Sequence, residues 1–341
     1  MTTYKAVAAV APGVLKLITL PVTAPGPGQV RIRVEACGVC HSDSVTVDGS
    51  LTGGVFPRVP GHEVVGRIDA VGEGVEGWAV GQRVGVGFLA GEDRVCHACR
   101  SGDFVNCDAP AIAGVTADGG YAELMIAEAR GLVRVPDSLA SAEAAPLLCA
   151  GLTTFNALRN SGARAGDVVA IHGLGGLGHL GVQFARKMGF RTVAIARGAD
   201  KAPLAHELGA HEYIDADTED AAAALQAMGG AKAIIGTAPT GRGMADVVGG
   251  LSPRGKLVVV AVPSDPIALS APTLVFGGRS IGGTLTGTVV DNEEGLAFAV
   301  LQGIRPVIET FPLERAPEAY ARMMRADVRF RAVLVMDAQA G

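Results

Sequence analysis

Hydrophobic positions along the chain follow two different rhythms. From residue 30 to about residue 135, short β-like runs such as 30–34 are separated by Gly, Pro and Asp, a pattern that predicts short strands joined by turns. After residue 150, apolar runs alternate with helix-like stretches, and the expected strands are 168–171, 192–196, 213–215, 233–236, 257–261 and 281–285. Strands separated by helices predict a parallel, doubly wound sheet.

This change of rhythm predicts an α/β protein with two domains. A chain of 341 residues exceeds the usual size of a single hydrophobic core. We expect a mostly-β domain over 1–150 and a doubly wound α/β domain over 151–287. The last segment, 288–341, mixes helices with a terminal strand and is expected to return to the first domain.

Composition and charge exclude several classes of protein. Apolar residues make up 49% of the sequence and charged residues 18%, which is typical of a globular protein. The formal net charge of −5 gives no field that would attract nucleic acid or an anionic membrane. No apolar run approaches the roughly 18 residues of a membrane span, and no signal-peptide pattern opens the chain. We therefore expect a cytoplasmic protein with neither kind of partner.

A glycine motif follows the first strand of the second half. It has the spacing GxGxxG, stands directly after the expected strand 168–171, and opens a helix. In this context the glycines permit a tight turn, a close approach to a pyrophosphate, and close packing of helix on strand. The alternative is an ordinary glycine-rich turn between strand and helix. The sequence predicts a dinucleotide contact at Gly173, Gly175, Gly176, Leu177 and Gly178.

The end of the next strand bears on the choice between NAD and NADP. An NAD site places an acidic residue there to bind the ribose 2′-hydroxyl, whereas a basic residue accommodates a 2′-phosphate. Here the position is occupied by Ala196 and Arg197. The sequence therefore favours NADP, although a small residue at this place also tolerates NAD.

Three cysteines gather in one short segment of the first half. Cys96, Cys99 and Cys107, with Asp93 before them, have the spacing of a compact lobe that closes on one zinc ion. A carboxylate is a harder ligand than a thiolate, but it can ligate zinc. His97 is the competing fourth ligand, and a lobe held only by packing is the alternative. We expect a structural zinc with Asp93 as its fourth ligand.

A second group of metal-ligand types is scattered over three separate loops. Cys40, His62 and Cys149 would supply two thiolates and one imidazole, a set that leaves a coordination position free for catalysis. No spacing rule brings these three together. Taken singly, Cys149 would be a buried apolar thiol and His62 a loop histidine with ordinary partners.

Together these motifs resemble the zinc-containing alcohol dehydrogenases of the medium-chain dehydrogenase/reductase superfamily. The segments GVCHSD at 38–43 and GHE at 61–63, the cysteine lobe, Cys149 and the glycine motif stand in that family's order, over nearly the whole chain. The resemblance implies a GroES-like, mostly-β catalytic domain and a Rossmann domain. It also implies an enzyme that moves hydride between an alcohol and NAD or NADP, and often a dimer or tetramer.

The resemblance also implies roles for single residues in the catalytic half. Cys40, His62 and Cys149 match the ligands of the catalytic zinc, and Asp43 and Glu63 match carboxylates behind them. Ser42 matches the hydroxyl that takes the proton of the substrate. Val45 stands where some members have a relay histidine, so His41 or water is considered for proton exit.

Two further positions are assigned to the cofactor by the same resemblance. Thr153 matches a position close to the nicotinamide, and Arg331 matches one near the pyrophosphate. Phe88 and Leu89 resemble positions that line the substrate pocket.

The expected activity is the reversible oxidation of a primary or secondary alcohol, with NADP favoured over NAD. Three alternatives stay open at this point: a zinc-free double-bond reductase, a non-catalytic dinucleotide-sensing protein, and a zinc-dependent polyol dehydrogenase. The joint presence of Cys40, His62 and Cys149 argues against the reductase. Cys149 stands where the polyol branch tends to place a carboxylate, which argues against the polyol enzyme.

Overall fold

The computed structural model describes residues 2–336, and these residues form two compact units. The first unit comprises the chain up to Leu152, the segment Thr286–Val300, and the residues from Pro306 onward. The second comprises Thr153–Leu285 with Leu301–Arg305. In the part of the chain that the structure describes, no helix has the length and apolar character needed to cross a bilayer.

The first unit is built on a seven-stranded sheet with the order β16-β17-β3-β4-β5-β9, in which β8 also pairs with β3. Apart from the parallel pair β16 and β17, the neighbouring strands are antiparallel. Its strands are β3 (Gln29–Val39), β4 (Val64–Val71), β5 (Arg83–Val86), β8 (Leu124–Glu128), β9 (Leu132–Arg134), β16 (Ile308–Pro312) and β17 (Arg331–Val335).

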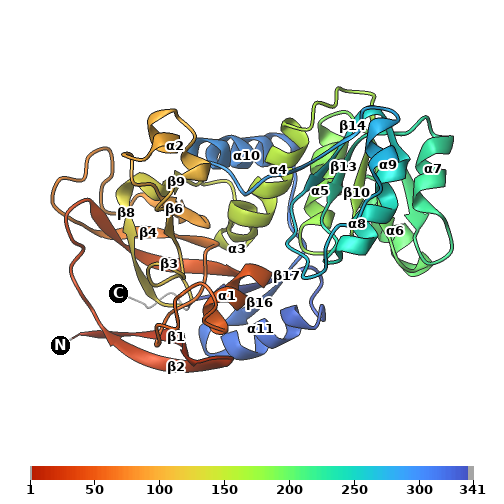
Figure 1. The fold of residues 1–341 in the computed structure, drawn as a ribbon. Helices are drawn as coiled ribbons and strands as arrows, with labels where there is room; N and C mark the ends of the chain where they lie inside the picture. The colour runs from red at the N-terminus through yellow and green to blue at the C-terminus, as the bar shows by residue number, and fades with distance from the viewer. Residues whose placement is uncertain (1, 337–341) are drawn as a thin grey trace. The chain divides into compact units, whose positions relative to one another are not determined.

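The chain's last strand pairs with one of its first. The residues of β17 lie antiparallel to β3, with Ala332 opposite Val39 and Val335 opposite Ala36 (Figure 1). The apolar side chains of both strands are buried in the core of the unit, whereas the polar side chains of β3 alternate with them and are less buried. This pairing brings Arg331, the first residue of β17, close to the end of β3, where the site described below begins.

Smaller elements complete the first unit. Two two-stranded sheets pair β1 (Thr3–Ala11) with β2 (Val14–Pro21) and β6 (Leu89–Gly91) with β7 (Ala111–Ile112). Its helices are α1 (Ser44–Val47), α2 (His97–Arg100), α3 (Ser141–Pro146), α10 (Val289–Gln302), whose last two residues belong to the second unit, and α11 (Ala316–Met324).

The second unit contains a six-stranded parallel sheet with the order β12-β11-β10-β13-β14-β15 (Figure 1). Parallel strands covered on both faces read as continuous apolar runs, which is how the sequence revealed them. The strands are β10 (Val168–His172), β11 (Arg191–Ala196), β12 (Glu212–Asp215), β13 (Ala231–Gly236), β14 (Leu251–Val259) and β15 (Ser280–Gly283).

Helices alternate with these strands along the chain, as a doubly wound sheet requires. They are α4 (Leu152–Arg159), α5 (Gly178–Lys187), α6 (Ala202–Glu207), α7 (Ala221–Ala227), α8 (Gly241–Val247) and α9 (Ala271–Val275). The strand order reverses direction at β10, so that β11 lies on one side and β13 on the other. In sheets of this kind, ligands bind at the carboxyl ends of the strands at such a point. The predicted α/β fold is confirmed.

The turn from β10 into α5 depends on two backbones that approach very closely. A Cβ atom added to Gly178, the first residue of α5, would lie only 1.8 Å from the carbonyl oxygen of Gly173. Because that oxygen belongs to the backbone, no side-chain rotation can relieve the contact. Gly178 is therefore required for α5 to begin this close to the end of β10.

We predict that Gly178→Ala destabilises the second unit by about 2–3 kcal/mol, since the added methyl group forces the helix away from the strand. Calorimetry should show the transition of this unit lowered by about 5–10 °C. Gly175→Ala is the matched control, because nothing lies within 4 Å of a Cβ at that exposed position. Equal stability losses in the two variants would contradict the close-packing argument.

Candidate active site and metal centres

The first sulfur of the site is placed at the end of a central strand. Cys40 directly follows β3, and its extended backbone starts a short 3₁₀ turn over His41–Asp43. The Asp43 side chain folds back and accepts a hydrogen bond from the backbone N–H of Cys40 at 2.9 Å. This contact fixes the turn, so that the Cys40 sulfur is held at the edge of a buried space.

His62 and Glu63 come from the loop that leads into β4. Both side chains are buried, with 2% and 0% of their surface exposed. His62 Nδ1 lies 2.9 Å from an Asp43 carboxylate oxygen, whereas His62 Nε2 is buried and has no hydrogen-bond partner among the described residues. An imidazole held through one nitrogen, with the other left open, is the arrangement of a metal ligand.

The second sulfur sits on an irregular helical turn. Cys149 belongs to a π-helical segment, Leu147–Gly151, that follows Pro146 at the end of α3. Proline lacks the N–H needed to continue a regular helix, and such π turns are frequent at functional sites. From α10, the Asn292 side chain donates a hydrogen bond to the carbonyl of Leu148 at 3.1 Å. This contact holds the turn that presents Cys149, and no sequence pattern predicts it.

The structure brings these scattered side chains together. The ligand atoms of Cys40, His62, Glu63 and Cys149 all lie within 4.8 Å of one another, and all four residues are buried. Glu63 also has one carboxylate oxygen, Oε2, with no hydrogen-bond partner among the described residues. Two sulfurs, an open imidazole nitrogen and an open carboxylate oxygen around one point fit a zinc ion well.

Electrostatics in this group is dominated by burial and by near neighbours. Although burial lowers the pKa of His62, the charges of Asp43 and Cys40 raise it well above its ordinary value. The hydrogen bond with Cys149 holds the pKa of the Cys40 thiol well below its usual range, and the same contact raises that of Cys149. These shifts favour a thiolate at Cys40 and a protonated thiol at Cys149.

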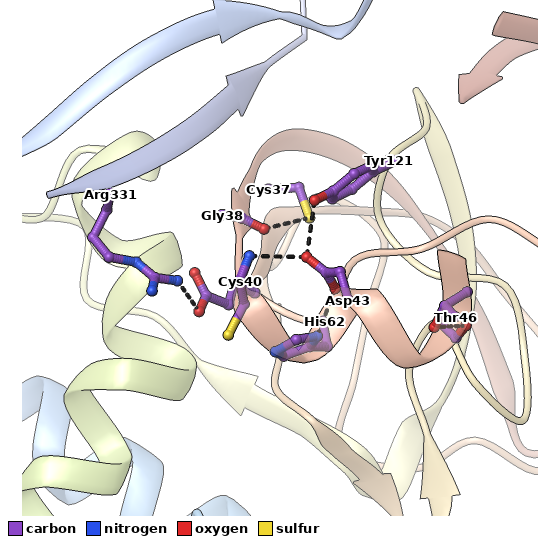
Figure 2. Close-up of polar contacts among 10 residues, drawn as sticks. Cys37, Gly38, Cys40, Asp43, Thr46, His62, Tyr121 and Arg331 are labelled. Atoms are coloured by element: carbon purple, nitrogen blue, oxygen red, sulfur yellow. Dashed lines mark hydrogen bonds and ion pairs between the residues drawn. The ribbon is translucent and has the colours of Figure 1, made fainter. Parts of the chain in front are cut away.

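Glu63 is paired with an arginine from the other end of the chain. Arg331 is buried, with 4% of its surface exposed, and donates to Glu63 Oε1 (Figure 2). Burial, partly offset by Arg331, raises the pKa of Glu63 to about 7. The family resemblance implies a place near the pyrophosphate for Arg331. The structure shows Arg331 paired with Glu63, and a contact with the dinucleotide stays a prediction.

The residues expected to handle the proton lie at the surface. Ser42 and His41 are exposed members of the 3₁₀ turn between Cys40 and Asp43. Phe88 packs its ring against His62 edge to face, with centroids 5.2 Å apart. It also lines a small cavity with Gly87, Leu89, Val133, Leu152, Thr286, Gly287, Thr288, Val289 and Asn292. The predicted pocket residues Phe88 and Leu89 thus line the same cavity, and Phe88 contacts His62.

The second cluster forms as the spacing predicts. The ligand atoms of Asp93, Cys96, Cys99 and Cys107 lie within 4.8 Å of one another, in a lobe between β6 and β7. The backbone N–H of Asp93 donates to the Cys107 sulfur at 3.3 Å, and that of Cys99 donates to the Cys96 sulfur at 3.4 Å. Amide donors aimed at sulfur are suited to thiolates bound to a metal.

Asp93 rather than His97 completes this cluster. One Asp93 oxygen accepts backbone hydrogen bonds from Val95 and Cys96, at 2.9 and 3.0 Å. The bond from Cys96 and then that from Val95 lower the pKa of Asp93 to about 2, so its carboxylate is charged near neutral pH. His97 is exposed and lies outside the cluster.

The glycine motif of the second unit takes the form expected of a dinucleotide-binding turn. Gly173 directly follows β10 with a φ of +104°, and the helix α5 begins at Gly178. Gly175 is exposed, and no atom lies within 4 Å of the place where its Cβ would be, so a ligand can approach the backbone there. Gly176 and Leu177 complete the turn before α5.

The end of β11 carries no carboxylate on its last residues. Ala196 is partly buried, Arg197 is exposed, and the Lys201 ammonium donates to the Arg197 carbonyl at 2.6 Å. Sequence reasoning missed Lys201, a second cation at this turn. Asp215 lies at the end of β12 and accepts the N–H of Gly198 at 2.8 Å. Thr153 is buried in α4.

Comparison with known proteins agrees with this arrangement. Residues 26–137 match the alcohol dehydrogenase GroES-like domain family, and residues 176–302 match the zinc-binding dehydrogenase family. The chain is 46% identical to the alcohol dehydrogenase notN of Aspergillus sp. (strain MF297-2) over 317 residues, 93% of each protein.

Two solved structures extend the comparison to the fold. A cinnamyl alcohol dehydrogenase from Sorghum bicolor superposes with a TM-score of 0.89 at 32% identity, covering 98% of each chain. The protein named CAD from Helicobacter pylori, solved in complex with NADP(H), superposes with a TM-score of 0.87 at 27% identity, covering 99% of each chain. The chain therefore belongs to the zinc-containing alcohol dehydrogenases of the medium-chain dehydrogenase/reductase family, with a catalytic and a structural zinc site.

Proposed function

We propose that this zinc-dependent alcohol dehydrogenase interconverts primary or secondary alcohols with their aldehydes or ketones and prefers NADP over NAD. The observation that carries the cofactor preference is the end of β11, where Ala196 and Arg197 stand instead of an acidic residue. Lys201 adds a second positive charge at the same turn. A 2′-phosphate would meet two cations there, and charge-assisted hydrogen bonds to phosphate are strong.

Two carboxylates near this turn bear on the proposal. Asp215 already accepts backbone N–H groups from Gly198 and Asp217, and these bonds lower its pKa. Its charge is therefore largely satisfied by the protein. Asp200 is exposed and belongs to the short 3₁₀ turn before α6, so it is the group that would favour NAD if it faced the ribose. The complex of the H. pylori relative with NADP(H) supports the NADP reading.

The side chains around the catalytic zinc have different roles in metal binding and in proton transfer. Cys40, His62 and Cys149 hold the ion, which when bound supplies a Lewis acid that lowers the pKa of an alcohol. Ser42 is exposed beside these buried ligands, and we assign it the transfer of the alcohol proton. His41, its exposed neighbour, passes that proton on to solvent. Thr153 and the glycine motif are assigned to the cofactor.

We also propose that the domains indicated by the sequence have separate functions. Residues 1–150 and 288–341 would carry the catalytic chemistry, and 151–287 would bind the dinucleotide. In the lobe, Asp93 is assigned as the fourth ligand of the structural zinc, because its carboxylate lies within reach of the sulfurs. The cytoplasmic location stays a prediction from the sequence.

A homo-oligomer is proposed from the edge of the parallel sheet. Among residues 2–336, β15 has a partner strand only on its β14 side, and an unpaired strand edge favours pairing with another chain. Exposed apolar side chains occur in the segments that precede β15, namely Val262, Val275 and Phe276, with 99%, 69% and 74% of their surface exposed. Burial of such side chains by a second copy would stabilise the assembly.

The two zinc sites are expected to respond differently to single substitutions. Cys149→Ala should reduce the zinc content from two ions per chain to one and abolish turnover, while leaving dinucleotide affinity nearly intact. Asp93→Ala is the matched variant, and it should lose the other zinc with a lower thermal stability but retained turnover. Zinc is measured by mass spectrometry and dinucleotide binding by calorimetry. Full activity of the Cys149→Ala variant would overturn the assignment of the catalytic site.

Cofactor preference is tested at Arg197. Arg197→Ala should lower kcat/KM for NADPH about 10-fold, since one charge-assisted hydrogen bond to a phosphate is lost, and should leave kcat/KM for NADH unchanged. The assay follows NADPH or NADH oxidation with benzaldehyde as substrate. Asp200→Ala is the control at the same turn, and it should not lower kcat/KM for NADPH. A wild-type enzyme that prefers NADH would refute the preference and leave the enzyme class intact.

The oligomer is tested at its exposed phenylalanine. The wild-type protein should elute as a dimer or tetramer in size-exclusion chromatography with light scattering. Phe276→Asp should shift it toward a smaller species, because a charge cannot be buried in an apolar contact. Val14→Asp, at a partly exposed apolar position on β2, is the control and should not change the mass. A monomeric wild-type protein would contradict the proposal.

A further inference from the structure

Tyr121 is the largest fully buried side chain among the described residues of the first unit, and none of the roles assigned above involves it. It follows Gly119 and Gly120 in an irregular segment before β8. Its backbone is fixed on both sides, because its N–H donates to Pro60 at 3.0 Å and its carbonyl accepts from Val7 at 2.8 Å. The residue is therefore held rigidly next to the loop that carries His62.

A glycine makes this close approach possible. Gly61, the residue before His62, has a φ of +106°, a conformation that side chains with a Cβ rarely adopt. A Cβ there would lie 2.6 Å from the Tyr121 ring. The ring thus packs directly on the backbone of Gly61, next to the zinc ligand His62. Its hydroxyl extends beyond this loop to Asp43.

The hydroxyl ends on a carboxylate that orients His62. Tyr121 Oη donates to Asp43 Oδ2 at 2.8 Å, and the same oxygen accepts the Cys40 N–H at 2.9 Å (Figure 2). The other oxygen, Oδ1, faces His62 Nδ1 at 2.9 Å. The carboxylate cannot rotate without losing contacts on both oxygens. The orientation of its contact with the His62 imidazole is therefore fixed.

The hydroxyl is a permanent donor. Burial, and then the charge of Asp43, raise the pKa of Tyr121 well above its ordinary value, so the phenol is a hydrogen-bond donor near neutral pH. Asp43 is only 1% exposed, and a buried carboxylate needs such donors to stay charged. A phenylalanine here would fill the same space and leave the carboxylate with one donor fewer.

We propose that Tyr121 is a positioning residue for the catalytic zinc site, acting through Asp43 to fix the orientation of His62. The inference concerns residues of the first unit alone and does not depend on which dinucleotide the enzyme prefers. Outer groups that orient a ligating histidine affect metal affinity about 10–100-fold. Because Tyr121 acts through Asp43, we expect its effect at the lower end of this range.

The test compares the rate of zinc release in Tyr121→Phe and in wild-type protein, with a chromogenic chelator in excess. The variant should lose the catalytic zinc about 10-fold faster. The structural zinc of the lobe should leave at an unchanged rate, and this second phase shows that the variant is folded. Tyr4→Phe is the matched control, because Tyr4 packs against the same core and its hydroxyl has no hydrogen-bond partner in the described protein.

A double-variant cycle separates this role from a general contribution to stability. In an Asp43→Ala background, Tyr121→Phe should change the release rate less than twofold, since the acceptor through which Tyr121 acts is gone. The cobalt-substituted Tyr121→Phe protein should also show a shifted visible spectrum. Zinc release at the wild-type rate, or an equal acceleration with and without Asp43, would overturn the proposal, as would a variant that loses thermal stability alone.

Discussion

The catalytic half of this protein depends on the neutralisation of charged groups that are almost completely buried. Cys40, His62, Glu63 and Cys149 converge, and the side chains of all four are buried. An uncompensated charge there would be very costly, so each group must have a partner. Arg331 faces Glu63, and a divalent metal ion would compensate the sulfurs and the open nitrogen of His62.

This requirement explains why distant parts of the chain meet in one sheet. Cys40 follows β3, Glu63 precedes β4, and Arg331 begins β17, the strand that pairs with β3. The antiparallel pairing of the last strand with one of the first delivers the arginine to the buried carboxylate. The same ladder of backbone hydrogen bonds that stabilises the sheet therefore also sets the electrostatics of the site.

The site is asymmetric in a way that suits its chemistry. Its ligands are buried, whereas Ser42 and His41 on the adjoining turn are exposed. Exposed groups can exchange protons with water, whereas electrostatic interactions among the buried ligands are stronger because little water reaches them. The structural lobe is different, because Asp93 and Cys96 are only partly buried and backbone amides supply much of their stabilisation.

The sequence by itself determined what local chemistry can encode. The apolar runs predicted the parallel sheet, the glycine spacing after β10 predicted its turn, and the cysteine spacing predicted the lobe, because in each case the interacting groups are close along the chain. Family resemblance, not spacing, named Cys40, His62 and Cys149 together. Only the tertiary structure decided that Arg331 faces Glu63, that Asn292 holds the turn of Cys149, and that Tyr121 reaches Asp43. These contacts join residues 78 to 268 positions apart, and no local pattern specifies which buried polar groups will satisfy one another.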